Sequence, residues 1–228
     1  MTSPFSIVFA LYPNLTQLDF TGPFEIFQRL PGARLHVASR EGGRLRADSG
    51  LVFAEVEKLA DIADCDLICV PGGYGVTGAL ADAEYLAQVR RLGQSARYVT
   101  SVCTGSLLLA AAGLLDGKRA TCHWAWRELL AESGVRVESA RVVRDGNCFT
   151  GGGVTAGIDF ALAVVTEIAG AEVAQGIQLM IEYAPAPPFD AGSPETAPAA
   201  VLEQTRAWAL QLLPERRAAF RAALARSR

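Results

Sequence analysis

Cys103 is the residue whose position most suggests chemistry. It stands between an apolar stretch of β character and an apolar helical stretch, in the sequence TSVCTGSLLL. Thr104 and Gly105 turn the chain at once from strand to helix, as at the nucleophile of G-x-S-x-G enzymes. The helix N-terminus favours negative charge on sulfur, which predicts a thiol pKa below its usual value of about 8.5. The N–H of Thr104 is expected to point the same way and to stabilise charge on a substrate. The alternative for Cys103 is a buried thiol that only packs behind the helix.

Glycine-rich segments that follow other predicted strands could bring exposed backbone N–H groups close to Cys103. Pro71, Gly72 and Gly73 come directly after the apolar run DLICV. Ligands of parallel sheets bind at the carboxyl ends of the strands, and glycines there let N–H groups approach a ligand closely. The triplet at residues 151–153 precedes a predicted helix and could line the pocket or pack against another helix. An ordinary turn and a flexible helix entry are the alternatives.

Two carboxylates and one histidine are candidates to handle protons. Asp19 lies in LTQLDFTGPFE near the end of the first predicted strand, and a carboxyl buried against Cys103 could shuttle protons. Helix capping is the alternative role for Asp19, and Glu25 is the second-choice carboxylate. His123 is close enough to the end of a predicted strand to reach the pocket. The tryptophans beside it favour a packed helix start over a Cys–His dyad.

The cysteine content favours free thiols over disulfides or a metal site. The five cysteines are scattered and odd in number, and the first residues do not form a secretion signal. Cys65 and Cys69 fall four apart in a predicted strand, so a metal pair is conceivable. There are only two histidines, however, and no second Cys/His pair has zinc spacing. We therefore expect no metal, inert buried thiols apart from Cys103, and a cytoplasmic protein.

The composition suits one large core and gives no sign of a polyanionic partner. Of the 228 residues, 50% are hydrophobic and 20% are charged, and the net charge is -3. Basic residues do not cluster before the last turns, which disfavours nucleic-acid binding as the main activity. The apolar run at 107–115 is broken by Gly113 and is far shorter than the roughly 18 residues that a membrane span needs. We expect neither a nucleic acid nor a membrane as partner.

The elements that must position these residues alternate between strands and helices. Apolar runs typical of buried parallel strands fall at residues 6–12, 33–39, 51–56, 66–70 and 96–102. Helical patterns fall at 16–29, 83–94, 105–115, 124–133 and 155–183, the last interrupted at Gly170. We expect a polar turn at 41–50 and a type I′ hairpin turn at Asp145-Gly146. This alternation predicts an α/β fold with a doubly wound, mainly parallel sheet sandwiched by helices.

The one shift in composition occurs at residues 184–200, where five prolines favour an extended chain. An apolar-patterned helix follows, so we expect an ordered arm that places a terminal helix, with a flexible tail as the alternative. Such an arm can lie across a neighbouring subunit. The predicted organisation is an α/β catalytic domain over residues 1–183. The arm and C-terminal helix, residues 184–228, belong to the same unit and are expected at a dimer interface.

Several blocks of the chain resemble the isonitrile (isocyanide) hydratases, within the PfpI-like branch of the class I glutamine amidotransferase-like superfamily. The blocks are QLDFTGPFEIF, VPGGYGV, SVCTGSLLLAAAGLLDGKRATCHWAW, TGGGVTAGIDFAL and EYAPAPPFDAGSPETAP. The motifs VCTG, PGG and LD-x-TGP recur across the branch, whereas the proline-rich arm is closer to the hydratases themselves. The resemblance covers nearly the whole chain.

The resemblance implies a flavodoxin-like sandwich, a homodimer and no metal or organic cofactor. It places the nucleophile on Cys103, the proton-handling acid on Asp19 and a supporting hydroxyl on Thr104. The implied reaction is hydration of a small-molecule isonitrile, R–N≡C, to an N-substituted formamide through a thioimidate on Cys103.

The resemblance also implies that backbone groups line the site, at Gly72, Gly73, Gly152 and Val154. Cys122 departs from the family pattern, since members commonly carry threonine at this position. The change adds a thiol near the pocket without removing any implied role, and it raises only the possibility of side reactions such as oxidation.

Other functions of the same branch are open alternatives. A redox, stress or glyoxalase-like cysteine enzyme would share the turn at Cys103 but usually lacks this proline-rich arm. A non-enzymatic regulatory domain is expected to precede DNA-binding helices, for which the residues before Arg228 leave little room. A peptidase would need a Cys–His pair, for which His123 is weak support.

Overall fold

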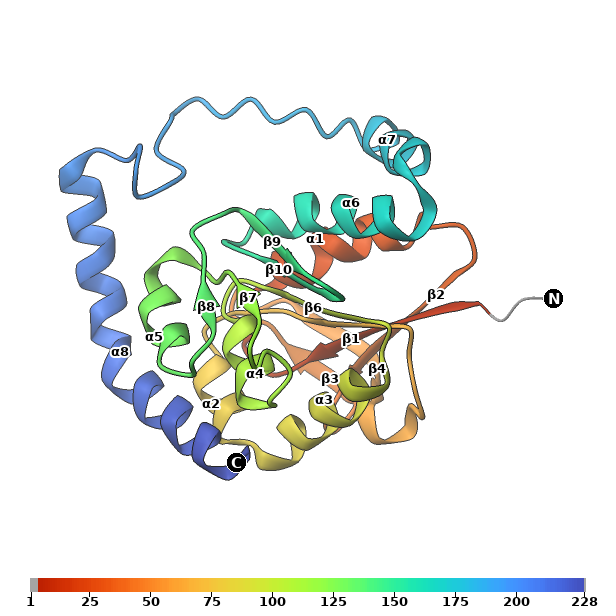
Figure 1. Cartoon of the computed structure of the whole chain (residues 1–228), viewed down its shortest axis with the longest axis horizontal. Coiled ribbons are helices and arrows are strands. Elements are labelled where there is room, and N and C mark those ends of the chain that lie inside the picture. Colours follow the sequence, from red (N-terminus) through yellow and green to blue (C-terminus); the bar gives the residue numbers. More distant parts are fainter. Residues whose placement is uncertain (1–3, 228) are drawn as a thin grey trace.

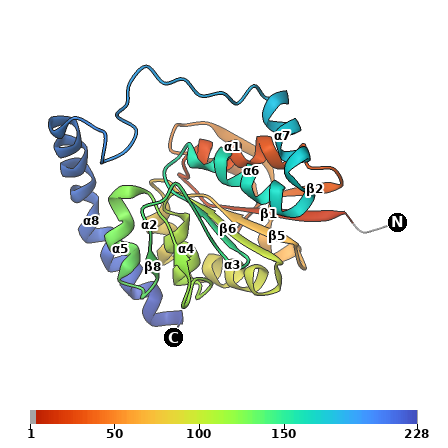
Figure 2. The ribbon, with the colours of Figure 1, turned by 45° about the horizontal axis from the view of Figure 1, so that its top comes forward.

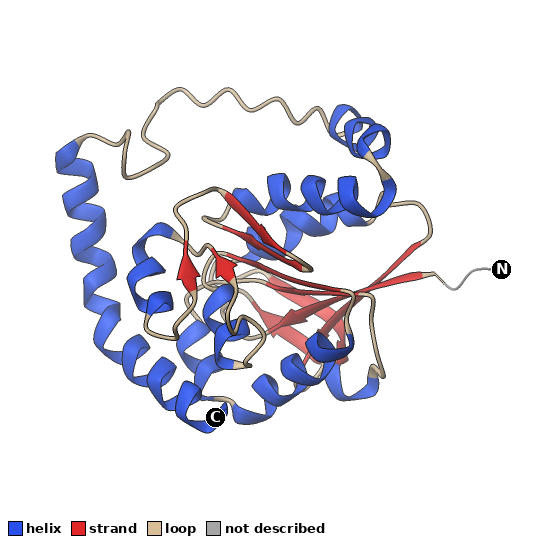
Figure 3. Ribbon diagram, in the orientation of Figure 1, coloured by secondary structure: helices blue, strands red, loops and turns tan. Residues whose placement is uncertain are grey.

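The structure is a computed structural model that describes residues 4–227, and its centre is an eight-stranded sheet (Figure 1, Figure 3). The sheet has the strand order β3-β4-β2-β1-β5-β6-β10-β9. Its strands are β1 (Phe5–Leu11), β2 (Ala33–Ser39), β3 (Gly43–Arg46), β4 (Val52–Lys58), β5 (Leu67–Val70), β6 (Tyr98–Val102), β9 (Val142–Asp145) and β10 (Cys148–Gly151). Neighbours from β4 to β10 run parallel, and only the two edge strands β3 and β9 are antiparallel. This confirms the predicted, mainly parallel α/β sheet.

Helices cover both faces of the sheet (Figure 1). The helices are α1 (Gln17–Phe27), α2 (Val76–Ala81), α3 (Ala83–Ser95), α4 (Gly105–Ala111), α5 (Arg127–Ala131), α6 (Ala156–Ala169), α7 (Ala171–Met180) and α8 (Ala199–Ser227). Short 3-10 turns lie at Leu59–Asp61 and Trp124–Trp126, and a two-stranded ladder pairs β7 (Arg119–Ala120) with β8 (Arg136–Val137). Helices α1 and α6 pack together on one face, and α2, α3 and α4 lie on the other.

The central strands are apolar because both of their faces are covered. Every residue of β5 is buried, as are the last five residues of β1. Phe9 on β1 contacts the rings of Phe20, Phe24 and Phe27 on α1, at centroid distances of 5.1, 5.6 and 6.1 Å. This aromatic cluster fixes α1 against the sheet. It thereby sets the position of the acidic residue in the first turn of α1.

Local details differ from the sequence-based expectations in three places. The segment expected as a polar turn contains β3, which pairs with β4 across an irregular register at the sheet edge. Helix α2 is six residues long and was not expected, since its three small residues and short length leave no helical period to detect. The hairpin loop is Gly146-Asn147, and only Gly146 has a positive φ, of 62°. That is the φ pattern of a type II′ turn instead of the expected type I′.

The C-terminal part of the chain is an extended arm followed by α8. The arm carries no helix or strand between α7 and α8 and passes over the outside of the molecule (Figure 1, Figure 2). Helix α8 then packs against α2 and α4, burying Ala209, Phe220 and Ala223. The expected terminal helix is therefore present, and it docks on the α/β part of its own chain. Within residues 4–227, no helix has both the length and the apolar character needed to cross a bilayer.

Candidate active site

Cys103 occupies a sharp turn between β6 and α4 at the carboxyl edge of the sheet. Its φ is +57°, a left-handed conformation that costs energy for a residue with a Cβ. The turn is held by the Cys103 N–H, which donates to the carbonyl of Gly151 on the adjacent strand β10 at 3.1 Å. The predicted strand–cysteine–helix turn is therefore present, and it carries the backbone strain often found at functional residues.

Asp19 lies in the first turn of α1 and is completely buried. Its Oδ2 accepts a hydrogen bond from the Gly72 N–H at 2.9 Å. Its Oδ1 has no backbone or side-chain partner of good geometry among residues 4–227. Burial raises the pKa of Asp19 to about 7, while the Gly72 N–H and the nearby Cys103 thiol act in the lowering direction. A carboxyl in this state can both give and accept a proton near neutral pH.

The thiol of Cys103 shifts in the direction opposite to the one predicted. Burial, followed by the nearby charge of Asp19, raises the pKa of Cys103 well above its ordinary value. The Thr104 N–H acts in the lowering direction, as expected at a helix start, but it does not outweigh burial. Helix α4 is only seven residues long, so its N-terminus offers limited compensation. Cys103 and Asp19 together therefore hold at least one proton at neutral pH.

The backbone after β5 is fitted closely around this pair. The Gly73 N–H donates to Thr104 Oγ1 at 3.0 Å, so Thr104 ties the end of β5 to the turn after β6. A Cβ on Gly72 would come within 2.5 Å of the Thr104 nitrogen and 2.8 Å of Asp19 Oδ2. Only glycine fits there, since such distances are far below van der Waals contact. The two glycines thus serve to bring the acid and the turn together.

A small cavity opens above Cys103, with a volume of about 160 Å³. It is lined by Thr16, Gly73, Tyr74, Cys103, Thr104, His123, Trp126, Val154, Trp208 and Arg216. The predicted residues Gly73, Thr104 and Val154 are therefore brought together at the cavity, with Asp19 and Gly72 beneath it. Gly152 is not among the lining residues, and its N–H donates to the Arg141 carbonyl at 2.9 Å.

The other two candidates for proton transfer, His123 and Glu25, do not share the surroundings of Asp19. His123 lines the cavity, but burial and the charges of Arg127 and Arg216 lower its pKa to about 4. It is therefore neutral at pH 7, and its Nδ1 accepts from the Ala125 N–H at 3.3 Å. Glu25 lies on the exposed side of α1, 2.8 Å from Arg29, and does not reach the cavity.

The other cysteines are buried and have raised pKa values. Burial raises the pKa of Cys65, Cys69 and Cys122 to about 12. Such thiols are almost wholly protonated at neutral pH and react slowly. Cys122 is close enough for its charge to affect Cys103, yet it does not line the cavity.

Sequence reasoning missed the residues that α8 brings to the cavity. Trp208 packs edge-on against Tyr74 at the cavity mouth, with a centroid distance of 5.5 Å. Arg216 is only 3% exposed, and its guanidinium lies 4.0 Å from the centre of the Trp126 ring. The available signal was an arginine on an apolar-patterned helix after a proline-rich arm. That signal indicates docking but does not indicate where the helix docks.

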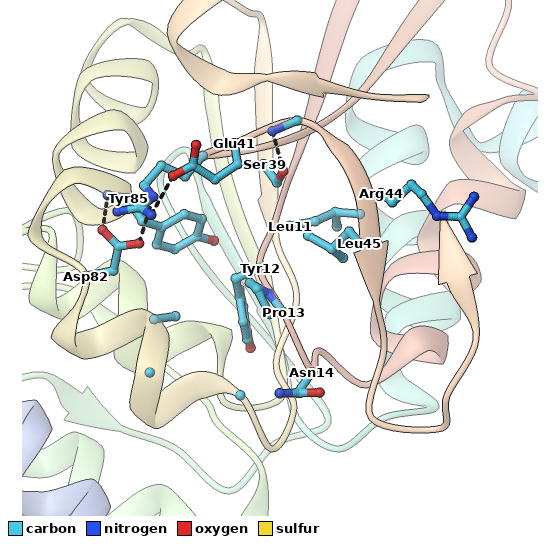
Figure 4. A pocket seen from close by; sticks show the side chains of 15 residues that line it. Leu11, Tyr12, Pro13, Asn14, Ser39, Glu41, Arg44, Leu45, Asp82 and Tyr85 are labelled. Atoms are coloured by element: carbon cyan, nitrogen blue, oxygen red, sulfur yellow. Dashed lines mark hydrogen bonds and ion pairs between the residues drawn. The ribbon is translucent and has the colours of Figure 1, made fainter. Parts of the chain in front are cut away.

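A second and larger cavity, of about 470 Å³, is lined in part by residues 12–14 of the β1–α1 connection (Figure 4). Tyr12 and Tyr85 form part of its wall, and their hydroxyls donate to the carbonyls of Pro71 and Ala10. Arg40 at its rim pairs with Glu41 at 2.5 Å and with Asp82 at 3.3 Å. Cys103, Asp19 and Thr104 do not line it.

Comparison with known proteins agrees with the resemblance seen in the sequence. The DJ-1/PfpI family profile matches residues 5–167. The chain is 50% identical over 200 residues to the isonitrile hydratase of Pseudomonas putida, an alignment that covers 88% of each chain. A crystal structure of a THiJ/PfpI family protein from Pseudomonas syringae superimposes with a TM-score of 0.92 and 40% identity, covering 95% of this chain and 90% of the other.

A regulator is also among the relatives. The HTH-type transcriptional regulator GbdR of Pseudomonas aeruginosa is 31% identical over 191 residues, which is 79% of this chain and 51% of the regulator. The family match spans more than half of the chain and includes Asp19, the Gly72–Gly73 turn and Cys103. The chain therefore belongs to the DJ-1/PfpI family.

Proposed function

We propose that this chain is an isonitrile hydratase that adds water to R–N≡C and releases an N-substituted formamide. The single observation that carries the proposal is the buried pair of Cys103 and Asp19, which influence each other's pKa, with Cys103 in the wall of a cavity of about 160 Å³. Such a pair supplies a nucleophile and a proton at the same point, which is what addition to an isonitrile carbon needs. The 50% identity to a protein of this name supports the choice of substrate class.

In the first step, the isonitrile carbon receives both a proton and the sulfur. The proton that the pair shares rests on the Cys103 thiol, which has the higher pKa, and it moves to Asp19 as Cys103 reacts as thiolate. The carbon lone pair takes the proton, the sulfur lone pair forms the C–S bond, and one C–N π pair moves to nitrogen. The product is a thioimidate, R–N=CH–S, on Cys103. Strain at the Cys103 turn and the fixed position of Asp19 hold the two groups in place for this step.

In the second step, water replaces the sulfur. Asp19, now ionised, takes a proton from water as the water oxygen adds to the thioimidate carbon, and it passes this proton on to the nitrogen. Breaking the C–S bond then releases R–NH–CHO, and one proton returns to the pair. Covalent catalysis divides one difficult addition into two easier ones. Thr104 supports both steps by holding the turn against Gly73.

The direct test offers cyclohexyl isocyanide and methylglyoxal separately to the purified protein, with formamide and lactate as the measured products. We expect formamide, and a mass increase on Cys103 when the reaction is trapped early. Lactate as the sole product would contradict the proposal and would favour a glyoxalase-like enzyme. Turnover of neither compound would favour a non-enzymatic regulatory domain, since the transcriptional regulator GbdR is among the relatives.

We also propose that residues 1–183 form the catalytic unit and that residues 184–228 join it to a second copy in a homodimer. Large apolar side chains near the arm support this assembly, since Leu179, Met180 and Phe189 are 82%, 77% and 78% exposed. Exposed apolar groups in one region are typical of interfaces. Light scattering on the purified chain tests the dimer, and Leu179→Asp with Met180→Asp is expected to give monomers. A wild-type monomer would contradict the assembly without affecting the proposed reaction.

A further inference from the structure

Arg216 is a buried cation for which the protein provides no counter-ion. No ion pair or hydrogen bond joins it to another of residues 4–227. Its Nε is buried without a partner. Its neighbour on α8, Arg217, instead pairs with Glu132 at 2.8 Å. A buried guanidinium normally needs a carboxylate or a full set of acceptors, because desolvation of an unpaired charge is costly.

The groups that face Arg216 do not supply a negative charge at neutral pH. Tyr12, Cys103 and Cys122 interact with it, and burial raises the pKa of each of the three. Stacking on Trp126 at 4.0 Å offsets part of the cost of burying the cation. Stacking uses the face of the guanidinium, however, and leaves its N–H edge without acceptors.

The position of Arg216 indicates which kind of group could accept hydrogen bonds from its guanidinium. Arg216 and Cys103 line the same cavity, and the other lining side chains are apolar, hydroxyl-bearing or a histidine that is neutral at pH 7. The one buried carboxyl nearby, Asp19, lies beneath Cys103 and outside the lining. An anion in this cavity would therefore meet an unpaired cation and no competing carboxylate.

We propose that Arg216 is the carboxylate-binding residue of the active site, and that the preferred substrates are small isonitriles that carry a carboxylate. The inference rests on the proposed hydratase function and specifies its substrate class. The guanidinium binds the carboxylate through its N–H edge while the isonitrile carbon lies at Cys103. Arg216 and Cys103 line one cavity of about 160 Å³, so a spacer of a few atoms is enough to join the two groups. Isocyanoacetate, with one carbon between them, is the simplest probe of this class.

The kinetic test compares isocyanoacetate with its methyl ester, which has the same isonitrile but no charge. The quantity measured is the ratio of kcat/KM for the acid to kcat/KM for the ester, so that general damage to a variant cancels. We expect Arg216→Gln to lower this ratio by about tenfold or more. Arg216→Lys, which keeps the charge, should retain part of the preference. The matched control is Arg217→Gln, one residue along α8, which should leave the ratio within about twofold of wild type.

A second measurement does not depend on hydratase activity. Alkylation of Cys103 by iodoacetate is compared with alkylation by iodoacetamide, and adducts on Cys103 are counted by mass spectrometry. Iodoacetate carries its carboxylate directly on the carbon that reacts, and in isocyanoacetate only the nitrogen and one CH2 separate the carboxylate from the reacting carbon, so both probes place the charge close to Cys103. The ratio of the two rates should fall by about tenfold in Arg216→Gln and not in Arg217→Gln.

The two measurements separate the possible failures. Hydration of the ester with no change of either ratio in Arg216→Gln overturns the carboxylate subsite and leaves the hydratase function intact. Failure to hydrate either isonitrile, together with a changed alkylation ratio, overturns the hydratase function and keeps the subsite. An unchanged alkylation ratio and no hydration overturn both.

Discussion

Two cavities at the carboxyl edge of the sheet can be compared, the one beside Tyr12 and Tyr85 and the one above Cys103. The first has the larger volume, and the second has the more reactive side chains. The cavity beside Tyr12 and Tyr85 has about three times the volume of the cavity above Cys103, at 470 against 160 Å³. In the larger cavity the polar groups already have partners, since both tyrosine hydroxyls donate to carbonyls and Arg40 is paired with acids. In the smaller one, the Asp19 Oδ1 and the Arg216 Nε have no such partner among the residues described.

The comparison shows that unsatisfied polar groups identify the site better than volume does. A buried polar atom without a partner costs free energy, and a strained turn such as that of Cys103 costs more. Among the residues described, the larger cavity has no buried polar side-chain atom without a partner, although one of its lining residues, Asn14, also has a left-handed φ, of +58°. We therefore expect substitutions of the same kind to have very different effects in the two cavities.

The largest expected effect is that of Cys103→Ala. Loss of the nucleophile removes the covalent route, so hydration of cyclohexyl isocyanide should fall by about 10⁴-fold or more. Cys148→Ala is the matched control, because Cys148 is also buried in the sheet but lines neither cavity. Formamide production is the measurement. Activity within tenfold of wild type in Cys103→Ala would show that the smaller cavity is not the site of covalent chemistry.

Asp19→Asn is expected to lower kcat/KM by about 10²–10⁴-fold, because asparagine keeps the shape but cannot carry the proton. The wild-type pH profile should report the same group. The pair is reactive when it holds one proton, and a second proton binds as pH falls below about 7, the pKa of Asp19. The kcat/KM of the wild type should therefore rise with pH through about 7. A flat profile between pH 5 and 9 would contradict the assignment.

The same substitution should stabilise the fold at high pH. The pKa of Asp19 is raised from 3.8 to about 7 in the folded chain, so the stability it contributes is complete below about pH 4 and is lost as pH rises through about 7. The shift corresponds to at most about 4 kcal/mol. Asp19→Asn should therefore have a Tm advantage over wild type that grows between pH 4 and pH 8, by about 5 °C or more. A Tm difference that does not vary with pH would mean that Asp19 is not held in a costly ionised state.

A smaller effect is expected from Gly72→Ala, beneath the smaller cavity. The added Cβ would meet the Thr104 nitrogen at 2.5 Å and Asp19 Oδ2 at 2.8 Å, so the turn and the acid must separate. We expect a loss of about 1–3 kcal/mol in the free energy of unfolding. Activity should fall by about tenfold or more, since small misplacements of reacting groups are costly. Denaturant titration and formamide production measure the two effects.

The smallest effect is expected from the matching substitution in the larger cavity, Gly78→Ala. Gly78 lies in α2 and lines the larger cavity, and an added Cβ meets nothing within 4 Å. Alanine in place of glycine in a helix should add about 0.5–1 kcal/mol of stability. The kcat/KM should stay within about twofold of wild type. A large loss of activity would show that the larger cavity takes part in the reaction.

The sequence predicted those residues of the site that follow the strands of a parallel sheet, because the strands themselves can be recognised from local apolar runs. Asp19, Gly73 and Cys103 each follow an apolar strand, and the carboxyl ends of parallel strands meet at one edge. Their proximity could therefore be predicted without coordinates. The direction of the Cys103 pKa could not, because it depends on how completely the fold excludes water from the thiol.

The residues of the site that the sequence did not predict come from α8, which reaches the cavity only by docking on other helices. Trp208 and Arg216 reach the cavity because α8 packs on α2 and α4, which lie roughly ninety or more residues earlier in the chain. No local pattern specifies such a contact. The edge strand β3 was missed for a different reason, since its short sequence GRLR alternates too little to separate it from a turn.

Because Arg216 lies on α8, the order in which a ribosome makes the chain affects when the site becomes complete. Cys103 and Asp19 leave the ribosome well before residue 216 is translated, and α8 is the last helix described. A domain folding during synthesis can thus form the cysteine turn while its cation is still absent. In such a nascent chain the thiol would be present without the group proposed to select its substrate. Selectivity would then be acquired as one of the last events in the making of the protein.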